Sequence, residues 1–165
     1  MKNLIILATV MTGFAVAAFA EAPAPVTDMR KALNAAAKDQ KMAFILMGRP
    51  ACGNCNATKR MIKEGQIPVT SADYVMADLN VDDPKAQEDF MRKYSKESFG
   101  ETLPFVVVTD SHGKALASSG GMKGAAEWTS ILTEAKVKAT AKAGAAGGAS
   151  GPGGKDSPFK TPATK

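Results

Sequence analysis

The feature that most constrains the fold is a continuous apolar run, MAFILMG at residues 42–48, which ends in a glycine. An unbroken apolar run of this length is typical of a strand that is buried on both faces of a sheet. Such a strand needs helices on each side of the sheet to cover it. The only two cysteines of the chain, Cys52 and Cys55, follow directly after this run, so we expect the same strand to position them.

The segments on both sides of this run alternate between helical and strand patterns. Apolar residues at helical spacing predict helices over 26–39, 56–65, 82–94 and 123–138. Continuous or alternating apolar residues predict strands over 42–48, 72–81, 103–110 and 114–121. This order predicts an α/β domain with a central mixed sheet of four to five strands and helices on both faces. We expect the sheet to be parallel at first and antiparallel at the edge formed by the closing hairpin.

Both ends of the chain differ in composition from this domain. Residues 1–20 carry Lys2, then an apolar run and small residues before Glu21, which is the pattern of a signal peptide. We therefore expect cleavage before Glu21 and export to the periplasm or out of the cell. The alternative is an uncleaved membrane anchor, for which the apolar run is short. Residues 139–165 are rich in Gly, Ala, Pro and Lys and predict a disordered tail, which leaves 21–138 for the domain.

The net charge of +5 belongs mostly to the two ends of the chain. Residues 139–165 hold four lysines and one aspartate, a charge of +3, and Lys2 adds +1, so that +1 remains for residues 21–138. The domain has no basic cluster interleaved with aromatic residues, which nucleic-acid binding would need. We therefore expect no nucleic-acid partner.

The spacing of Cys52 and Cys55 fits several kinds of site. A zinc site needs four ligands, and the single histidine, His112, stands alone in a predicted turn about sixty residues further along. Covalent haem is excluded, because Asn56 and not a histidine follows Cys55. A Cu(I) site of the two thiolates, helped by Met47, remains open. A permanent disulfide also remains open, although closing so small a loop would add little stability.

A redox pair is the interpretation that fits the placement of the cysteines best. The strand that ends at Gly48 delivers Cys52 to the first turn of a helix, with Cys55 one turn later on the same face. The free amide groups and the dipole of the helix N-terminus favour the Cys52 thiolate, and Arg49 just upstream would add positive potential. Cys52 is then the exposed nucleophile, and Cys55, lying deeper, resolves the mixed disulfide.

The C-x-x-C motif between a buried strand and a helix, the later segment LPFVVVTD and the closing hairpin and helix resemble the thioredoxin-like family over residues 26–138. The resemblance implies a thioredoxin-like fold. It also implies that Pro104 follows a cis peptide bond, lies against the cysteine pair and positions the substrate. The backbone of Leu103 would then pair with a bound substrate peptide.

Several residues depart from the pattern of that family. Ala51 stands where thioredoxins usually have Trp, and no acid occurs near Leu46, where a buried acid often moves the proton of the resolving cysteine. The residues between the cysteines, Gly53 and Asn54, are neither the Gly-Pro of reductases nor a His-containing pair. We expect these two residues and Arg49 to contact the substrate, and a cysteine pair that is not strongly oxidising and resolves slowly.

The sequence thus predicts an exported thiol–disulfide oxidoreductase that acts on protein thiols and disulfides through its C-G-N-C motif. Cys52 would be the nucleophile and Cys55 the resolving residue. We expect no dissociable cofactor, no metal and a monomer. If the protein acts as a reductant, its electrons would come from a membrane thiol carrier. The alternative, from a different class, is a binding module of the same fold that is redox-inert or binds Cu(I).

Overall fold

The computed structural model describes the backbone of residues 21–147 and the side chains of residues 21–141. The predicted signal peptide, 1–20, and the last part of the predicted tail, 148–165, lie outside the described residues. Helices and strands alternate along the described part of the chain. In order, they are β1 (Pro25–Val26), α1 (Met29–Asp39), β2 (Met42–Gly48), α2 (Gly53–Lys63), β3 (Tyr74–Asn80), α3 (Pro84–Tyr94), β4 (Phe105–Thr109), β5 (Ala115–Gly120) and α4 (Ala125–Gly147).

The strand β2 lies at the centre of a five-stranded sheet with the order β1-β3-β2-β4-β5. Both β1 and β2 pair with β3 in parallel, whereas β4 pairs antiparallel with β2 and with β5. In β2, Leu46 lies opposite Asp78 of β3 and Val106 of β4. The central position explains why residues 43–48 are all buried. It also confirms the predicted mixed α/β sheet.

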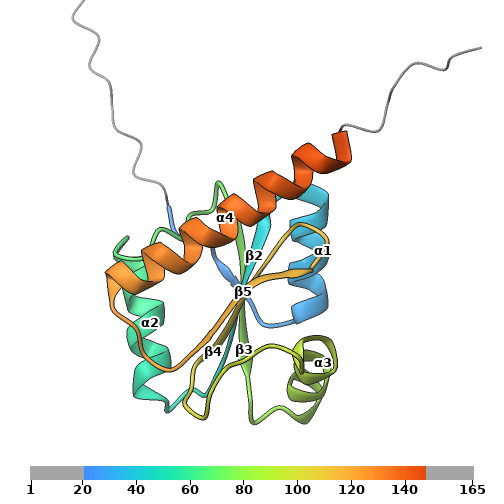
Figure 1. The fold of residues 1–165 in the computed structure, drawn as a ribbon. Helices are drawn as coiled ribbons and strands as arrows, with labels where there is room; N and C mark the ends of the chain where they lie inside the picture. The colour runs from blue at the N-terminus through green and yellow to red at the C-terminus, as the bar shows by residue number, and fades with distance from the viewer. Residues whose placement is uncertain (1–20, 148–165) are drawn as a thin grey trace, which may run out of the picture.

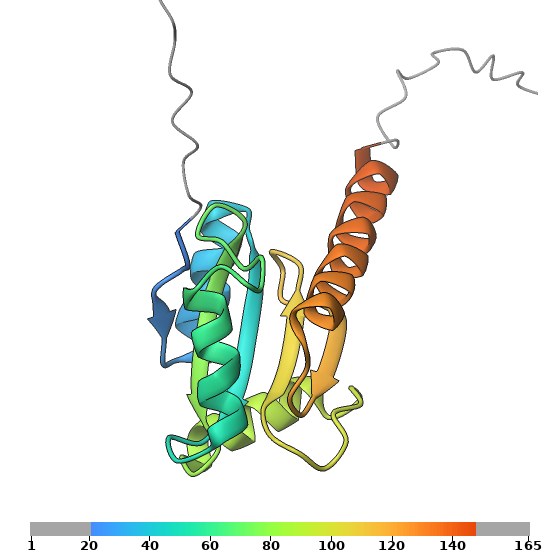
Figure 2. The same ribbon diagram turned by 90° about the vertical axis from the view of Figure 1, so that its left-hand side faces the viewer.

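Helices cover both faces of this sheet, as Figures 1 and 2 show. On one face, Phe44 and Leu46 of β2 pack in one cluster with residues of α2 and α4. On the other face, Ile45 and Met47 pack with residues of α1 and α3. Successive residues of a strand point to opposite faces, so an unbroken apolar strand is what both layers require.

The helix α4 is fixed to the sheet by Trp128, whose side chain is fully buried. Its ring packs edge-on against Phe44, with the ring centroids 5.8 Å apart. Leu132 and Ala135 continue the buried stripe one and two turns later. Truncating a buried aromatic residue of this size costs about 3–5 kcal/mol, so this one side chain contributes a large part of the attachment of α4.

The strand β1 was not expected from the sequence. It consists of Pro25 and Val26, which pair with Met76 and Ala77 of β3. Val26 was predicted to begin a helix, but that helix starts at Met29. Two residues are too few for an alternating pattern, and proline is generally depleted in strands, so the local sequence carries no strand signal.

The last helix is longer than predicted. The tail was expected to begin at residue 139, whereas α4 continues to Gly147. Residues 139–147 read ATAKAGAAG, and alanine has the highest helix propensity of all residues. Adding residues to a helix that already exists avoids the cost of nucleation, so the alanines favour continued helix. No helix of the described residues is long and apolar enough to cross a membrane.

Candidate functional site

The two cysteines lie at the N-terminus of α2, directly after the central strand. They form a disulfide, with the two Cα atoms 5.3 Å apart. Cys52 is the N-cap of α2, and its Sγ accepts a hydrogen bond from the backbone N–H of Cys55 at 3.1 Å. Cys52 is partly exposed, whereas Cys55 is fully buried. Cys52 therefore lies nearer the surface than Cys55.

Gly48, the last residue of β2, makes room for the buried cysteine. A Cβ atom at this position would lie 2.9 Å from Sγ of Cys55 and 3.2 Å from a methyl carbon of Leu46. Carbon and sulfur do not approach so closely without displacing one of them. The glycine that ends the apolar run thus allows α2 to bring Cys55 down onto the strand.

The peptide bond between Leu103 and Pro104 is cis, as the family resemblance implied. The loop that contains it lies against the start of α2, because Asn54 Nδ2 donates a hydrogen bond to the Leu103 carbonyl at 3.5 Å. On its other side, the backbone N–H of Gly121 donates to the Pro104 carbonyl at 3.0 Å. Pro104 is buried and Leu103 is partly exposed. The structure thus brings Cys52, Asn54 and the cis-proline loop together.

Gly53 begins α2 and is exposed, with open space where a side chain would project. It therefore leaves the surface beside Cys52 uncovered.

Arg49 is engaged by an acid that lies far away in the sequence. Its guanidinium makes an ion pair with Asp82, at 2.8 Å between Nη2 and Oδ1. Its Nε also donates to the same carboxylate at 3.0 Å. Both side chains are about half exposed. We had expected Arg49 to add positive potential at Cys52, but the carboxylate of Asp82 offsets much of this charge.

No protein-family model and no curated protein matches the sequence, but solved structures match the fold. Chloroplastic thioredoxin z matches with a TM-score of 0.51 and 16% identity, over 71% of this chain and 96% of that one. A thioredoxin-like protein from Clostridium perfringens gives 0.54 and 16%, over 79% and 94% of the two chains. The germline thioredoxin Deadhead of Drosophila melanogaster gives 0.51 and 22%, over 67% and 97%. The chain has a thioredoxin fold.

Within this thioredoxin fold, an ion pair that we had not predicted lies on the α2 face of the sheet. Leu46 is apolar, but its neighbour in register on β3 is Asp78. Lys59, one turn after Cys55 on α2, binds Asp78 with 3.1 Å between Nζ and Oδ2. Both side chains are only about a quarter exposed. Tyr74, Met76 and Asp78 occupy every second position of β3, so the sequence indicated that Asp78 faces the same side of the sheet as the two buried residues.

Met47, the residue that we had considered as a third copper ligand, does not share a face with the cysteines. It packs in the cluster formed with α1 and α3, and 1% of it is exposed. Its sulfur lies on the far side of the sheet from α2. In the described part of the chain, no three His, Cys, Asp or Glu residues are grouped as they would be in a metal site. His112 lies in the turn before β5, where its backbone N–H donates to Asp110.

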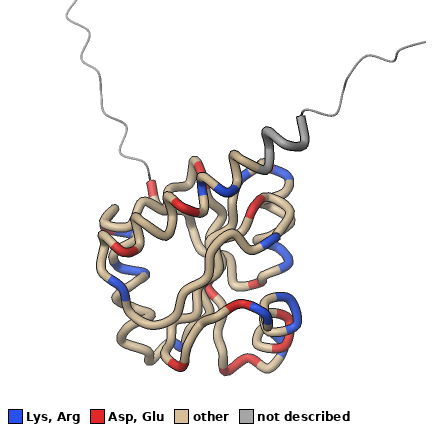
Figure 3. The backbone as a smooth tube through the Cα atoms, viewed as in Figure 1, with Lys and Arg blue, Asp and Glu red and all other residues tan. Residues whose placement is uncertain are grey.

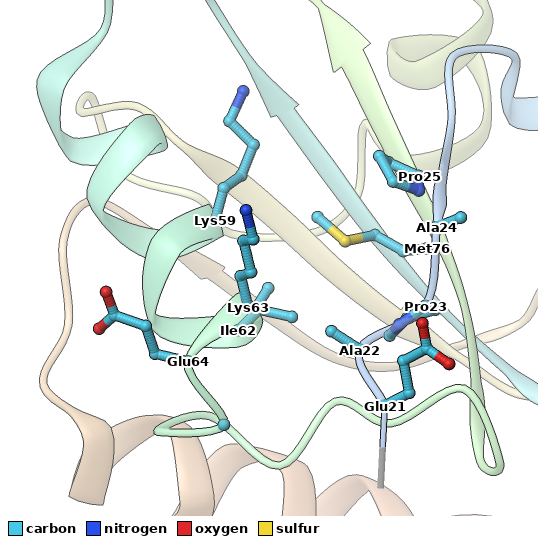
Figure 4. Close-up of a pocket in the computed structure, with 11 residues that line it drawn as sticks. Glu21, Ala22, Pro23, Ala24, Pro25, Lys59, Ile62, Lys63, Glu64 and Met76 are labelled. Carbon is cyan, nitrogen blue, oxygen red and sulfur yellow. The ribbon is translucent and has the colours of Figure 1, made fainter.

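A cavity of about 900 Å³ lies between the second half of α2 and the segment 21–25 (Figure 4). Ile62 and Met76 contribute apolar surface to it, and Lys59 and Lys63 project beside it from α2. The cysteines and the cis-proline are not among the residues that line it. Figure 3 shows acidic and basic residues interspersed over the drawn part of the chain. Because the cavity is not lined by the cysteines or the cis-proline, the surface around the disulfide is the better candidate for the functional site.

Proposed function

We propose that this chain is a thiol–disulfide oxidoreductase that exchanges disulfides with proteins through Cys52 and Cys55. The observation that carries the proposal is the disulfide itself, which has a partly exposed sulfur at a helix N-terminus and lies beside a cis-proline loop. A disulfide that only stabilised the fold would need neither the open surface at Gly53 nor the difference in depth between its two sulfurs.

The exchange has two steps when the protein acts as a reductant. The Cys52 thiolate attacks one sulfur of a substrate disulfide, and the other substrate sulfur leaves as a thiolate that takes up a proton. The Cys55 thiolate then attacks Sγ of Cys52 in the mixed disulfide. This second step releases the substrate as a dithiol and leaves the Cys52–Cys55 disulfide. Two electrons pass to the substrate, and the reverse sequence oxidises a substrate dithiol.

The N-terminus of α2 favours the thiolate form of Cys52 once the disulfide is reduced. The backbone N–H of Cys55 already donates to Sγ of Cys52 at 3.1 Å, and after reduction the same amide stabilises a thiolate. A negative charge at this end of a helix is also favoured by the helix dipole. Since Arg49 is paired with Asp82, the helix contributes more of this effect than the arginine.

Asp78 takes the proton that Cys55 must lose before it attacks. Cys55 is fully buried, and burial in apolar surroundings disfavours its thiolate. Sγ of Cys55 lies next to Gly48, two residues along β2 from Leu46, whose neighbour in register on β3 is Asp78. Lys59 holds the carboxylate in place from the turn of α2 that follows Cys55. The Asp78–Lys59 pair thus provides, from β3, the acid that the apolar strand β2 does not contain.

The substrate binds as an extended peptide beside the disulfide. The backbone of Leu103 pairs with it, and Gly53, Asn54 and Arg49 form the adjoining surface. In the oxidised protein the amide of Asn54 donates to the Leu103 carbonyl at 3.5 Å, a long hydrogen bond that a substrate N–H displaces easily. Pro104 holds this carbonyl at the edge of the site.

The protein acts after export, in the periplasm or outside the cell, where disulfides persist. The support for this is the composition of residues 1–20. As a reductant it draws electrons from a membrane thiol carrier, and it works as a monomer. N-terminal sequencing of the protein recovered from a periplasmic fraction tests export: a chain that begins at Glu21 supports it, and an intact Met1 in the cytoplasmic fraction contradicts it.

Trapping of mixed disulfides tests the exchange reaction. Cys55→Ser, which keeps the nucleophile, should accumulate disulfide-linked adducts with a dithiol–disulfide model substrate such as insulin. Cys52→Ser should form none, and both variants should lose turnover. Equal turnover in both variants and the wild type would rule the reaction out. The Cu(I)-binding alternative has less support, because Met47 lies on the other face; metal analysis under reducing conditions would detect bound copper.

A further inference from the structure

Two methionines of the described residues are exposed to the same extent. Met91 on α3 and Met122 between β5 and α4 are each 42% exposed. Met29, Met47 and Met76, by contrast, are buried. The two side chains are thus equally exposed, but only Met122 contacts α2, the helix that carries the cysteine pair.

Met122 is held beside the candidate site by the backbone around it. The preceding residue, Gly121, has a φ of 75°, a conformation that glycine adopts without strain. Its N–H donates to the carbonyl of Pro104 at 3.0 Å. The Met122 side chain then lies against α2, because its Sδ is 3.8 Å from Oγ1 of Thr58.

Thr58 connects this sulfur to the residues between the cysteines. The residue is fully buried, and its Oγ1 is 3.0 Å from the backbone carbonyl of Asn54. A hydroxyl has a single hydrogen to donate. The carbonyl oxygen, nearer and a much stronger acceptor than a thioether, holds this hydrogen in the present state. Asn54 in turn donates from its side chain to the Leu103 carbonyl.

We propose that Met122 is an oxidation site through which peroxide slows disulfide exchange at Cys52 and Cys55. A hydroperoxide transfers an oxygen atom to Sδ: its O–O bond breaks, an S–O bond forms, the sulfur loses two electrons and the peroxide is reduced to water or an alcohol. This inference rests on the proposed function for its meaning, although its test does not require a physiological substrate.

The new oxygen competes for the hydrogen of Thr58. A sulfoxide oxygen is a strong acceptor, and because Sδ already contacts Oγ1 of Thr58 at 3.8 Å, an S–O bond directed obliquely toward Thr58 brings the new oxygen within hydrogen-bonding reach of the hydroxyl. Donation to it removes the side-chain hydrogen bond of Thr58 to the Asn54 carbonyl, at the first turn of α2. The oxidation also replaces an apolar surface beside the cis-proline loop with a polar one. Loosening this turn disturbs the backbone N–H of Cys55 that contacts Sγ of Cys52, so the reaction slows, by about 2- to 10-fold for the loss of one ordinary hydrogen bond.

The test compares the full-length wild type with Met91→Leu and Met122→Leu. Each protein is treated with hydrogen peroxide while Cys52 and Cys55 are joined, so that no free thiol is oxidised. Peptide mass spectrometry then measures the sulfoxide at each methionine. The rate at which dithiothreitol reduces the disulfide is measured before and after treatment. Because this readout is a small-molecule reaction, it remains valid even if insulin trapping fails and the proposed function falls.

Peroxide should slow the reduction about 2- to 10-fold in the wild type and in Met91→Leu, and leave Met122→Leu unchanged. Methionine sulfoxide reductase should restore the rate. In Thr58→Val, which lacks the hydroxyl, peroxide should leave the rate of disulfide reduction unchanged. In Thr58→Ser, peroxide should slow it as in the wild type. An unchanged rate in wild type whose Met122 is fully converted to the sulfoxide would overturn the inference. So would an equal loss of rate in Met122→Leu.

Discussion

At the scale of single residues, the site depends on the absence of a side chain at Gly48. Gly48→Ala should destabilise the oxidised protein by about 1–3 kcal/mol, the usual cost of overpacking a core, because the added Cβ would lie 2.9 Å from Sγ of Cys55. Denaturant unfolding measures this change. Gly53→Ala is the matched control, since nothing lies within 4 Å of its added Cβ. Equal losses in the two variants would contradict the packing argument.

Asp78 is tested by a substitution that keeps its shape. Asp78→Asn should slow the attack of Cys55 on a mixed disulfide about 10²- to 10⁴-fold at neutral pH, because the amide cannot accept the proton. The rate at which the reduced Cys52 thiol is alkylated should be the same in this variant as in the wild type. Stopped-flow measurement of the two steps over a range of pH separates them. Asp89→Asn, on α3 on the other side of the sheet, is the control. If Asp78→Asn leaves the Cys55 step unaffected, Asp78 has no part in it.

Local motifs predicted some site residues better than others. The positions of Cys52 and Cys55, the cis bond at Pro104 and its approach to α2 follow from short segments whose context is local or shared with the family. The pairing of Arg49 with Asp82 joins residues 33 positions apart. It depends on where the loop after β3 ends, which the sequence near Arg49 does not specify.

At the scale of elements, α3 offers a direct test of capping. Asp83 is its N-cap, and its carboxylate accepts from the N–H groups of Lys85 and Ala86. Asp83→Ala should destabilise the protein by about 1 kcal/mol, the usual cost of losing such a cap. Asp82→Ala keeps the cap and loses only the exposed pair with Arg49, so thermal unfolding should show a smaller loss. A larger loss in Asp82→Ala would reverse the assignment.

The long elements were predictable because their patterns are strong. Each of the four predicted strands and four predicted helices has a counterpart in the structure, with ends shifted by a few residues. The exceptions have physical reasons: β1 forms only because residues 25 and 26 reach the free edge of β3. The helix α4 extends beyond residue 138 because alanine strongly favours helix. The Gly-, Ala-, Pro- and Lys-rich composition of residues 139–165 had instead indicated a tail.

At the scale of the whole molecule, two buried tyrosines make stability sensitive to alkaline pH. Burial, with the nearby charge of Asp73, raises the pKa of Tyr74 to about 12. Burial also raises the pKa of Tyr94, with smaller contributions from Asp110 and Glu97. The folded protein favours the neutral phenol. The stabilisation is therefore complete below about pH 10, the pKa of an unperturbed tyrosine, and is lost as the pH rises toward 12.

Urea midpoints measured between pH 8 and pH 12 test this expectation. The hydroxyl of Tyr74 has no hydrogen-bond partner within the described residues, so Tyr74→Phe should fold and should lose less stability above pH 10 than the wild type. Identical pH profiles for the two proteins would show that Tyr74 does not titrate during unfolding.

The measurement that tests the central claim most directly is the reduction potential of the Cys52–Cys55 disulfide. Equilibration against a thiol–disulfide buffer, followed by alkylation of the free thiols, gives its value. A working exchange catalyst should fall between about −270 and −120 mV, the span of known thiol–disulfide catalysts. A value below about −300 mV, which is typical of structural disulfides, would contradict the account. The pair would then be a disulfide that only stabilises the fold.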